Sequence, residues 1–197
     1  FEAIEKTAAL GVPFMGGLSF QKVSKEIPRN FAPGLTDDEL RQVRLKLDEA
    51  GVRLLAYYIQ DIPGDESGCR TVFEFGRKIG IETFMTEPKP EALGMIEKFC
   101  DTYDLKVALH NHGPKASPVY WNPEGIMKVC AGRSRRLGAC ADLGYWMRSG
   151  IDPLQAANLL KDRLLTIQIR HRAGENKALA GEFIRGAHLP DDFDLVK

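Results

Sequence analysis

The feature that most constrains the fold is a regular alternation between short apolar segments and longer segments with helical periodicity. The short segments are bounded by Gly or Pro, which is typical of strands, and the longer ones repeat apolar residues at helical spacing. Six strands are predicted, over residues 12–20, 52–61, 81–87, 106–112, 139–145 and 164–171. Because a connecting segment separates each strand from the next, we expect parallel strands covered by helices.

The clearest helix signal follows Thr36. The stretch TDDE places Glu39 three residues after the threonine, which predicts a capping box, and Gly51 is a natural helix end. The buried stripe of this helix is predicted to consist of Leu40, Val43, Leu47 and Ala50. Further helices are predicted over residues 1–10, 65–79, 89–104, 123–136 and 152–162, whereas residues 172–197 have no clear period.

The alternation favours an α/β fold of the (β/α)₈ TIM barrel type over a doubly wound sheet. No Gly-rich phosphate-binding loop follows the early strands, and polar residues gather at the C-terminal ends of several strands, where barrel sites lie. The first helix starts at Phe1 without a strand before it, and no eighth βα unit is evident after residue 171. We therefore expect a single, incomplete barrel domain over residues 1–197.

Charge and hydropathy narrow the range of partners. Lys plus Arg and Asp plus Glu both number 27, so neither nucleic acid nor an anionic membrane is expected as the main partner. No run of about 18 apolar residues is present, so no membrane-spanning helix is expected. The chain begins with Phe1, which is consistent with a cytoplasmic protein and equally with export after loss of a leader. A homo-oligomer would cover the open sheet edges of an incomplete barrel.

The four cysteines are predicted to be reduced and structural. They are scattered along the chain without the spacing of a metal site or a disulfide framework, at Cys69, Cys100, Cys130 and Cys140.

Polar residues at the strand ends form the candidate site. Strand side chains alternate between faces, so if Val107 and Leu109 pack on the helices, His110 and His112 point into the barrel. By the same alternation, polar residues at the ends of the other strands also point into the barrel. The candidate set is Glu87, His110, His112, Asp142, Gln168 and Arg170.

Acids, imidazoles and an amide that meet at a barrel mouth suit a divalent metal holding sugar hydroxyls. The alternative is that these side chains only satisfy one another and water, and Glu87 could equally cap the helix that follows Pro88. Asp142 lies in a strand too apolar to accept an unpaired charge, which favours a functional role. Tyr58 could line the pocket, and Tyr145 could stack on a sugar ring.

The chain resembles the xylose isomerase-like TIM barrels of the sugar phosphate isomerase/epimerase superfamily. The resemblance covers nearly the whole chain and rests on the segments LTDDELRQVRLKLDEAGVRL, FEFGRKIGIETFMTEPKPEAL, YDLKVALHNHGP, ADLGYWMRSGIDP and KDRLLTIQIRH. In that superfamily Glu, Asp, His and Glu from successive strand ends hold a divalent metal, often Mn, Mg or Co. Carboxylates then move a proton on and off the carbon next to a carbonyl.

Carried over by position, the resemblance implies His110 and Asp142 as metal ligands. Glu87, at a strand end, is a further candidate ligand or the proton acceptor. The seventh-strand histidine of the superfamily falls at Gln168, and its eighth-strand glutamate has no counterpart.

Two motifs depart from the superfamily pattern. Asp-Thr-Gly-His around the sixth strand reads Asp-Leu-Gly-Tyr at residues 142–145, and His-Leu-Lys-Asp after the seventh reads Gln-Ile-Arg-His at residues 168–171. Arg170 stays protonated and cannot replace a proton-transfer lysine. His171 could replace the missing ligand only if the strand ends before it.

The resemblance implies a divalent-metal-dependent isomerase or epimerase acting on a small-molecule sugar or sugar derivative by proton transfer next to a carbonyl. Glu87 or a residue outside this chain would take the proton with help from His112, and Gln168 would position a hydroxyl. Arg170 is a further candidate catalytic residue. Two alternatives stay open. One is a lyase or dehydratase acting on a keto-sugar or inositol-like substrate, and the other is a non-catalytic sugar-binding barrel with a degenerate metal site.

Overall fold

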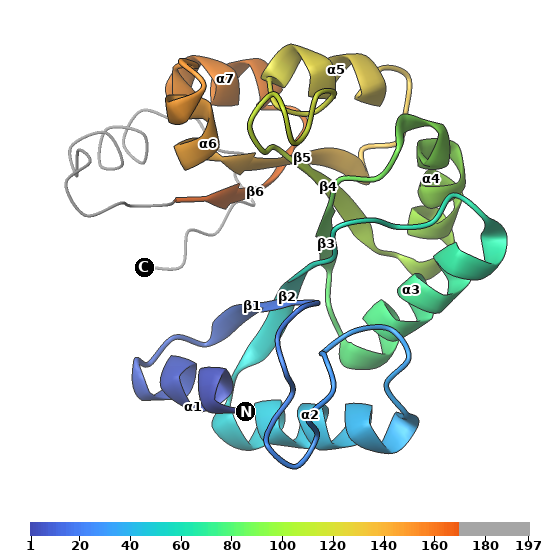
Figure 1. The fold of residues 1–197 in the computed structure, drawn as a ribbon, viewed down its shortest axis with the longest axis vertical. Coiled ribbons are helices and arrows are strands. Elements are labelled where there is room, and N and C mark those ends of the chain that lie inside the picture. Colours follow the sequence, from blue (N-terminus) through green and yellow to red (C-terminus); the bar gives the residue numbers. More distant parts are fainter. Residues whose placement is uncertain (170–197) are drawn as a thin grey trace. The chain divides into compact units, whose positions relative to one another are not determined.

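The computed structural model describes residues 1–169, which form two compact units, Phe1–Lys106 and the part that starts at Val107. We call them the N-terminal and the C-terminal unit. Within each unit, parallel strands are flanked by helices (Figure 1). The expected α/β class with parallel strands is confirmed, whereas the eight-fold barrel and the single domain over residues 1–197 stay predictions. Arg170 and His171 lie outside the described residues.

The N-terminal unit contains three parallel strands in sequence order, with helices between them. Its elements are α1 (Glu2–Ala9), β1 (Phe14–Leu18), α2 (Asp37–Ala50), β2 (Arg53–Tyr58), α3 (Glu66–Ile79), β3 (Thr83–Thr86), the 3-10 helix η1 (Pro90–Ala92) and α4 (Leu93–Tyr103).

Helix α2 begins and ends as the sequence predicts. The Thr36 side chain accepts a hydrogen bond from the Glu39 backbone N–H at 3.2 Å, and Glu39 accepts one from the Thr36 N–H at 2.7 Å, which completes the capping box. Gly51 ends the helix with a φ of 64°, a conformation that costs glycine little. Leu40, Val43 and Leu47 of the predicted stripe are buried, whereas Ala50, in the last turn, is only half-buried.

The C-terminal unit also contains three parallel strands, β4 (Lys106–His110), β5 (Leu137–Asp142) and β6 (Leu164–Gln168). Its helices are α5 (Pro123–Cys130), α6 (Leu143–Arg148) and α7 (Pro153–Leu160). Figure 1 shows α5 and α7 side by side above these strands.

Several predicted boundaries in the C-terminal unit were wrong, including the end of the strand predicted over residues 164–171, which lies at Gln168. The strand predicted over residues 139–145 ends at Asp142, because the Asp142 side chain accepts a hydrogen bond from the Tyr145 N–H and starts α6. The helix predicted over residues 123–136 ends at Cys130, where the chain turns through Gly132 with a φ of 70°. The strand predicted over residues 106–112 ends at His110.

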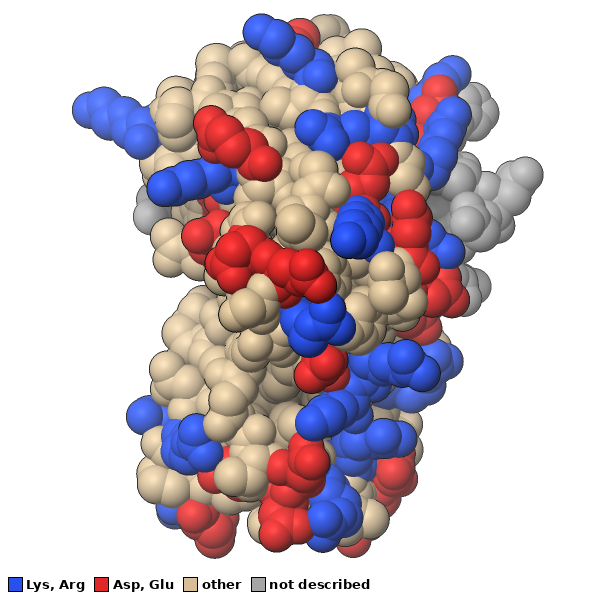
Figure 2. Space-filling view, turned by 90° about the vertical axis from the view of Figure 1, so that its right-hand side faces the viewer, with Lys and Arg blue, Asp and Glu red and all other residues tan. Residues whose placement is uncertain are grey.

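All four cysteines are buried and free of disulfides, as predicted. Burial, with a smaller contribution from Asp65, raises the pKa of the Cys69 thiol to about 11, so this cysteine is a poor nucleophile. Across residues 1–169, no helix is both long and apolar enough to cross a membrane. Figure 2 shows basic and acidic side chains mixed over the face it presents, in keeping with the balanced composition.

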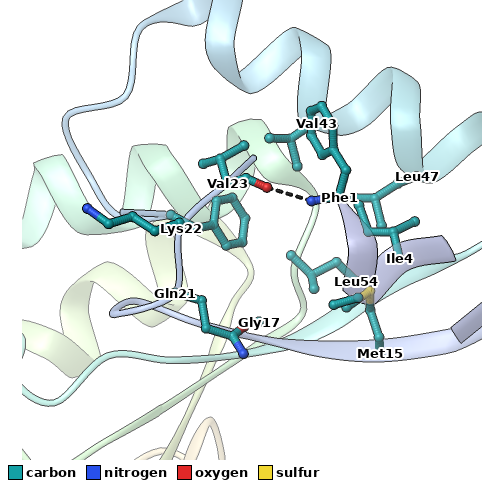
Figure 3. A pocket seen from close by; sticks show the side chains of 12 residues that line it. Phe1, Ile4, Met15, Gly17, Gln21, Lys22, Val23, Val43, Leu47 and Leu54 are labelled. Carbon is teal, nitrogen blue, oxygen red and sulfur yellow. Dashed lines mark hydrogen bonds between the residues drawn. The ribbon is translucent and has the colours of Figure 1, made fainter. Parts of the chain in front are cut away.

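A small cavity of about 60 Å³ lies in the N-terminal unit, lined mostly by apolar side chains of α1, α2, β1, β2 and the loop after β1. Figure 3 shows Ile4, Met15 and Leu54 among the residues that line it. Ligand pockets usually measure about 300–1,000 Å³, so we interpret this cavity as a packing gap rather than a sugar site.

Two helical glycines provide a test of core packing in the N-terminal unit. A Cβ at Gly76 in α3 would lie 2.5 Å from the ring of Phe84, whereas a Cβ at Gly94 in α4 would meet no atom within 4 Å. We expect Gly76→Ala to lower the free energy of unfolding by about 1–3 kcal/mol, because the buried ring has little room to move. Gly94→Ala is the matched control and should raise that free energy by up to about 1 kcal/mol. Urea unfolding of both variants measures the difference, and equal stabilisation by both would contradict the packing.

Candidate functional site

The C-terminal ends of β4, β5 and β6 each carry a polar residue, His110, Asp142 and Gln168. Because the strands are parallel, these ends meet at one edge of the sheet. The register places Asp142 directly beside Gln168 and His110 beside Cys140. His110 and Asp142 are 1% and 0% exposed, respectively, which is exceptional for groups that can carry charge.

The three side chains converge on the imidazole of His110. Its Nε2 lies 3.1 Å from the Gln168 Oε1, a hydrogen-bond distance, and 3.6 Å from the Asp142 Oδ2, which is longer than a hydrogen bond. The other Asp142 oxygen, Oδ1, accepts a hydrogen bond from the Tyr145 N–H at 3.1 Å. The start of α6 thus orients the carboxylate so that Oδ2 faces the imidazole.

Asn111 fixes the position of Asp142 through the backbone. Its side-chain amide donates to the Asp142 carbonyl at 3.0 Å, and the Asp142 N–H donates to the Asn111 Oδ1 at 2.7 Å. Both residues are 0% exposed. Buried hydrogen bonds of this kind are costly to break, so the pair holds the ends of β4 and β5 together.

A row of rings leads away from His110. The ring of His112 lies 4.5 Å from that of His110, and the ring of Tyr145 lies 4.6 Å from that of His112, measured between centroids. The Arg148 guanidinium lies over the Tyr145 ring at 4.4 Å. We call His112, Tyr145 and Arg148 the aromatic shelf.

In the N-terminal unit, Glu87 follows β3, and the Tyr58 hydroxyl donates to its Oε1 at 3.1 Å. Lys89, not Glu87, occupies the N-cap position of η1, so Glu87 is not the N-cap residue of the helix that follows Pro88. The edge of the Phe20 ring, which is 63% exposed, packs against Tyr58 with centroids 6.4 Å apart.

The cluster of His110, Asp142 and Gln168 fits a divalent cation. Two ligand atoms each about 2.1 Å from one ion are separated by about 3.0 Å at a right angle and about 3.6 Å at 120°. The distances from the His110 Nε2 to its two neighbours, 3.1 and 3.6 Å, fall in this range. A buried carboxylate also requires a compensating positive charge, which a cation would supply.

The structure brings together four of the predicted site residues, His110, His112, Asp142 and Gln168. Glu87 lies at the end of β3 in the other unit, and Arg170 lies outside the described residues.

Two neighbours of the cluster were missed by sequence reasoning. Asn111 follows Leu109 by two positions, so strand alternation places it on the face that packs on helices, and its polarity on that face was the available signal. Arg148 could be placed beside Tyr145 only once α6 was known. Residues three apart on a helix are neighbours, as Tyr145 and Arg148 are.

No protein-family model and no curated protein sequence matches the chain. Solved structures do match. An uncharacterised protein from Parabacteroides distasonis is 28% identical with a TM-score of 0.72, and the match covers 94% of this chain and 80% of that one. A D-psicose 3-epimerase crystallised in the presence of D-fructose is 14% identical with a TM-score of 0.74, covering 93% and 74%. A sugar phosphate isomerase/epimerase from Parabacteroides distasonis is 10% identical with a TM-score of 0.67, covering 92% and 76%.

Proposed function

Since the chain has the fold of the xylose isomerase-like sugar isomerases and epimerases, we propose that it is a divalent-metal-dependent isomerase or epimerase of a sugar or sugar derivative. The observation that carries the proposal is the buried cluster of His110, Asp142 and Gln168 at one end of three parallel strands. A buried carboxylate and imidazole at this position suit Mn, Mg or Co rather than a typical core, and the amide beside them can hold a substrate hydroxyl.

Asp142 and His110 would hold the cation, and Glu87 is a further candidate ligand. Its carboxylate, added to the imidazoles of His110 and His112, would complete a donor set that suits such a cation. When bound, a divalent cation supplies Lewis-acid polarisation of a substrate carbonyl.

The remaining chemistry is proton transfer by the chain's own groups. Glu87 would take the proton from the carbon next to the carbonyl, and the Tyr58 hydroxyl would orient the carboxylate through its hydrogen bond. His112 would assist as a second proton carrier beside His110. Gln168 would hold a substrate hydroxyl. Arg170 lies outside the described residues and stays a candidate from the sequence alone.

The experiment combines metal analysis with isotope exchange. Purified protein is analysed for bound metal and then incubated with a panel of ketoses in D₂O with Mn²⁺, Mg²⁺ or Co²⁺. We expect a stoichiometric metal and deuterium on the carbon next to the carbonyl of recovered substrate and product, detected by mass spectrometry. Loss of water from the sugar would instead support a lyase or dehydratase. Sugar binding without deuterium uptake would support a binding protein with a degenerate site, for which Gln168 in place of an imidazole is the favouring observation.

A further inference from the structure

We propose that Arg148 binds a negatively charged group of the substrate, so that the site selects a sugar carrying a phosphate or a carboxylate over a neutral sugar. The inference rests on the proposed function for the position of the sugar. It adds the chemical class of the substrate and a residue that determines specificity.

Arg148 differs from the other arginines that lie over aromatic rings in residues 1–169. Arg53 lies over Phe14 and pairs with Glu82 at 3.0 Å, and Arg70 lies over Phe99 and pairs with Glu66 at 2.7 Å. Arg148 lies closer to its ring, at 4.4 Å, and among the described residues no carboxylate pairs with it. The ring therefore orients a cation whose anion the described residues do not provide.

The aromatic shelf connects this cation to the candidate metal cluster. Contacts of 4.4, 4.6 and 4.5 Å lead from Arg148 over Tyr145 and His112 to His110, whose Nε2 lies within the cluster. The rings of His110 and Tyr145 lie only 6.2 Å apart, and the Arg148 guanidinium lies 4.4 Å from the Tyr145 ring, so all three groups fall within reach of one small-molecule substrate. A substrate with its carbonyl at the cluster could thus present an anionic group at its far end to Arg148.

A guanidinium suits this task better than an ammonium group. Its planar fork of N–H donors matches the paired oxygens of a phosphate or a carboxylate. Stacking on Tyr145 restricts the side chain before the substrate arrives, so less conformational entropy is lost on binding. Arg148 is exposed at the protein surface, so the anionic end would remain partly hydrated while the carbonyl end is buried.

The test uses three probes that differ at one carbon: D-fructose, D-fructuronate and D-fructose 6-phosphate. Metal-supplemented wild type, Arg148→Ala and Arg148→Lys are compared by deuterium exchange and by calorimetric titration. Arg148→Ala should raise KM and Kd for at least one charged probe by about 10- to 100-fold, with kcat and the values for D-fructose changed less than about twofold. Arg148→Lys should recover part of the loss. The charged probe that wild type prefers identifies phosphate or carboxylate as the recognised group.

Arg135→Ala is the matched control. It removes an exposed arginine of the same unit that contacts Asp162 at the opposite end of β5 from the site, so it should change none of these values. Equal binding of charged and neutral probes, or a preference that survives Arg148→Ala, would overturn the inference. Arg148-dependent binding without deuterium exchange would support it and count against the proposed isomerase. Deuterium exchange on D-fructose without any effect of Arg148→Ala would support the proposed isomerase and count against the inference about Arg148. If no probe binds, the inference and the proposed function are both contradicted.

Discussion

Asp142→Asn is expected to reduce divalent-metal affinity by at least about 100-fold and to abolish turnover, while the protein stays folded. The carboxamide lacks the charge that attracts the cation, but it can still accept the hydrogen bond from the Tyr145 N–H that starts α6. Removing a charge from a fully buried position should leave the metal-free stability unchanged or raised. Equilibrium dialysis with metal analysis measures the affinity, and thermal unfolding with and without metal measures the linkage.

Asp142→Ala separates the two tasks of this side chain. It removes the cap as well as the charge, so it should unfold with a free energy about 1 kcal/mol lower than Asp142→Asn, with metal binding equally lost. Wild-type metal affinity in Asp142→Asn would show that the cation, if one is bound, lies elsewhere, and the proposed centre would be wrong.

Glu87→Gln is expected to lower kcat by about 10²- to 10⁴-fold at saturating metal, because the amide cannot accept a proton from the substrate. Tyr58→Phe removes only the hydrogen bond to the carboxylate and should lower kcat by less than about tenfold. Deuterium uptake from D₂O by recovered substrate follows the proton transfer itself in both variants.

Glu87→Gln also distinguishes the two roles considered for Glu87, metal ligand and proton acceptor. If kcat at saturating metal is unchanged and only metal affinity falls, Glu87 is a ligand and another group takes the proton. If deuterium uptake and metal affinity both stay at the wild-type level, Glu87 has neither role.

The sequence predicted the elements whose signals are local. The capping box at Thr36 and the left-handed Gly51 depend on neighbouring residues alone, and both ends of α2 were predicted correctly. Strand alternation likewise predicted that His110 and Gln168 would meet, because side-chain direction in a strand follows from its pleat.

Features that depend on tertiary contacts were not predictable in this way. Residues 143–147 continue the apolar run of β5, and a short apolar run does not distinguish strand from helix; the hydrogen bond from the Tyr145 N–H to Asp142 decides it. The role of Asn111 depends on its distance from Asp142, which lies 31 positions away in the chain.

The paired hydrogen bonds between Asn111 and the Asp142 backbone have a consequence for how a metal would exchange. The carboxylate is anchored by amide groups that are not themselves ligands, so releasing one ion need not loosen the strand ends, and little reordering accompanies uptake of the next. Replacement of one divalent metal by another would then require no rearrangement of the strand ends, and cellular supply together with intrinsic affinity order would determine which ion the protein carries.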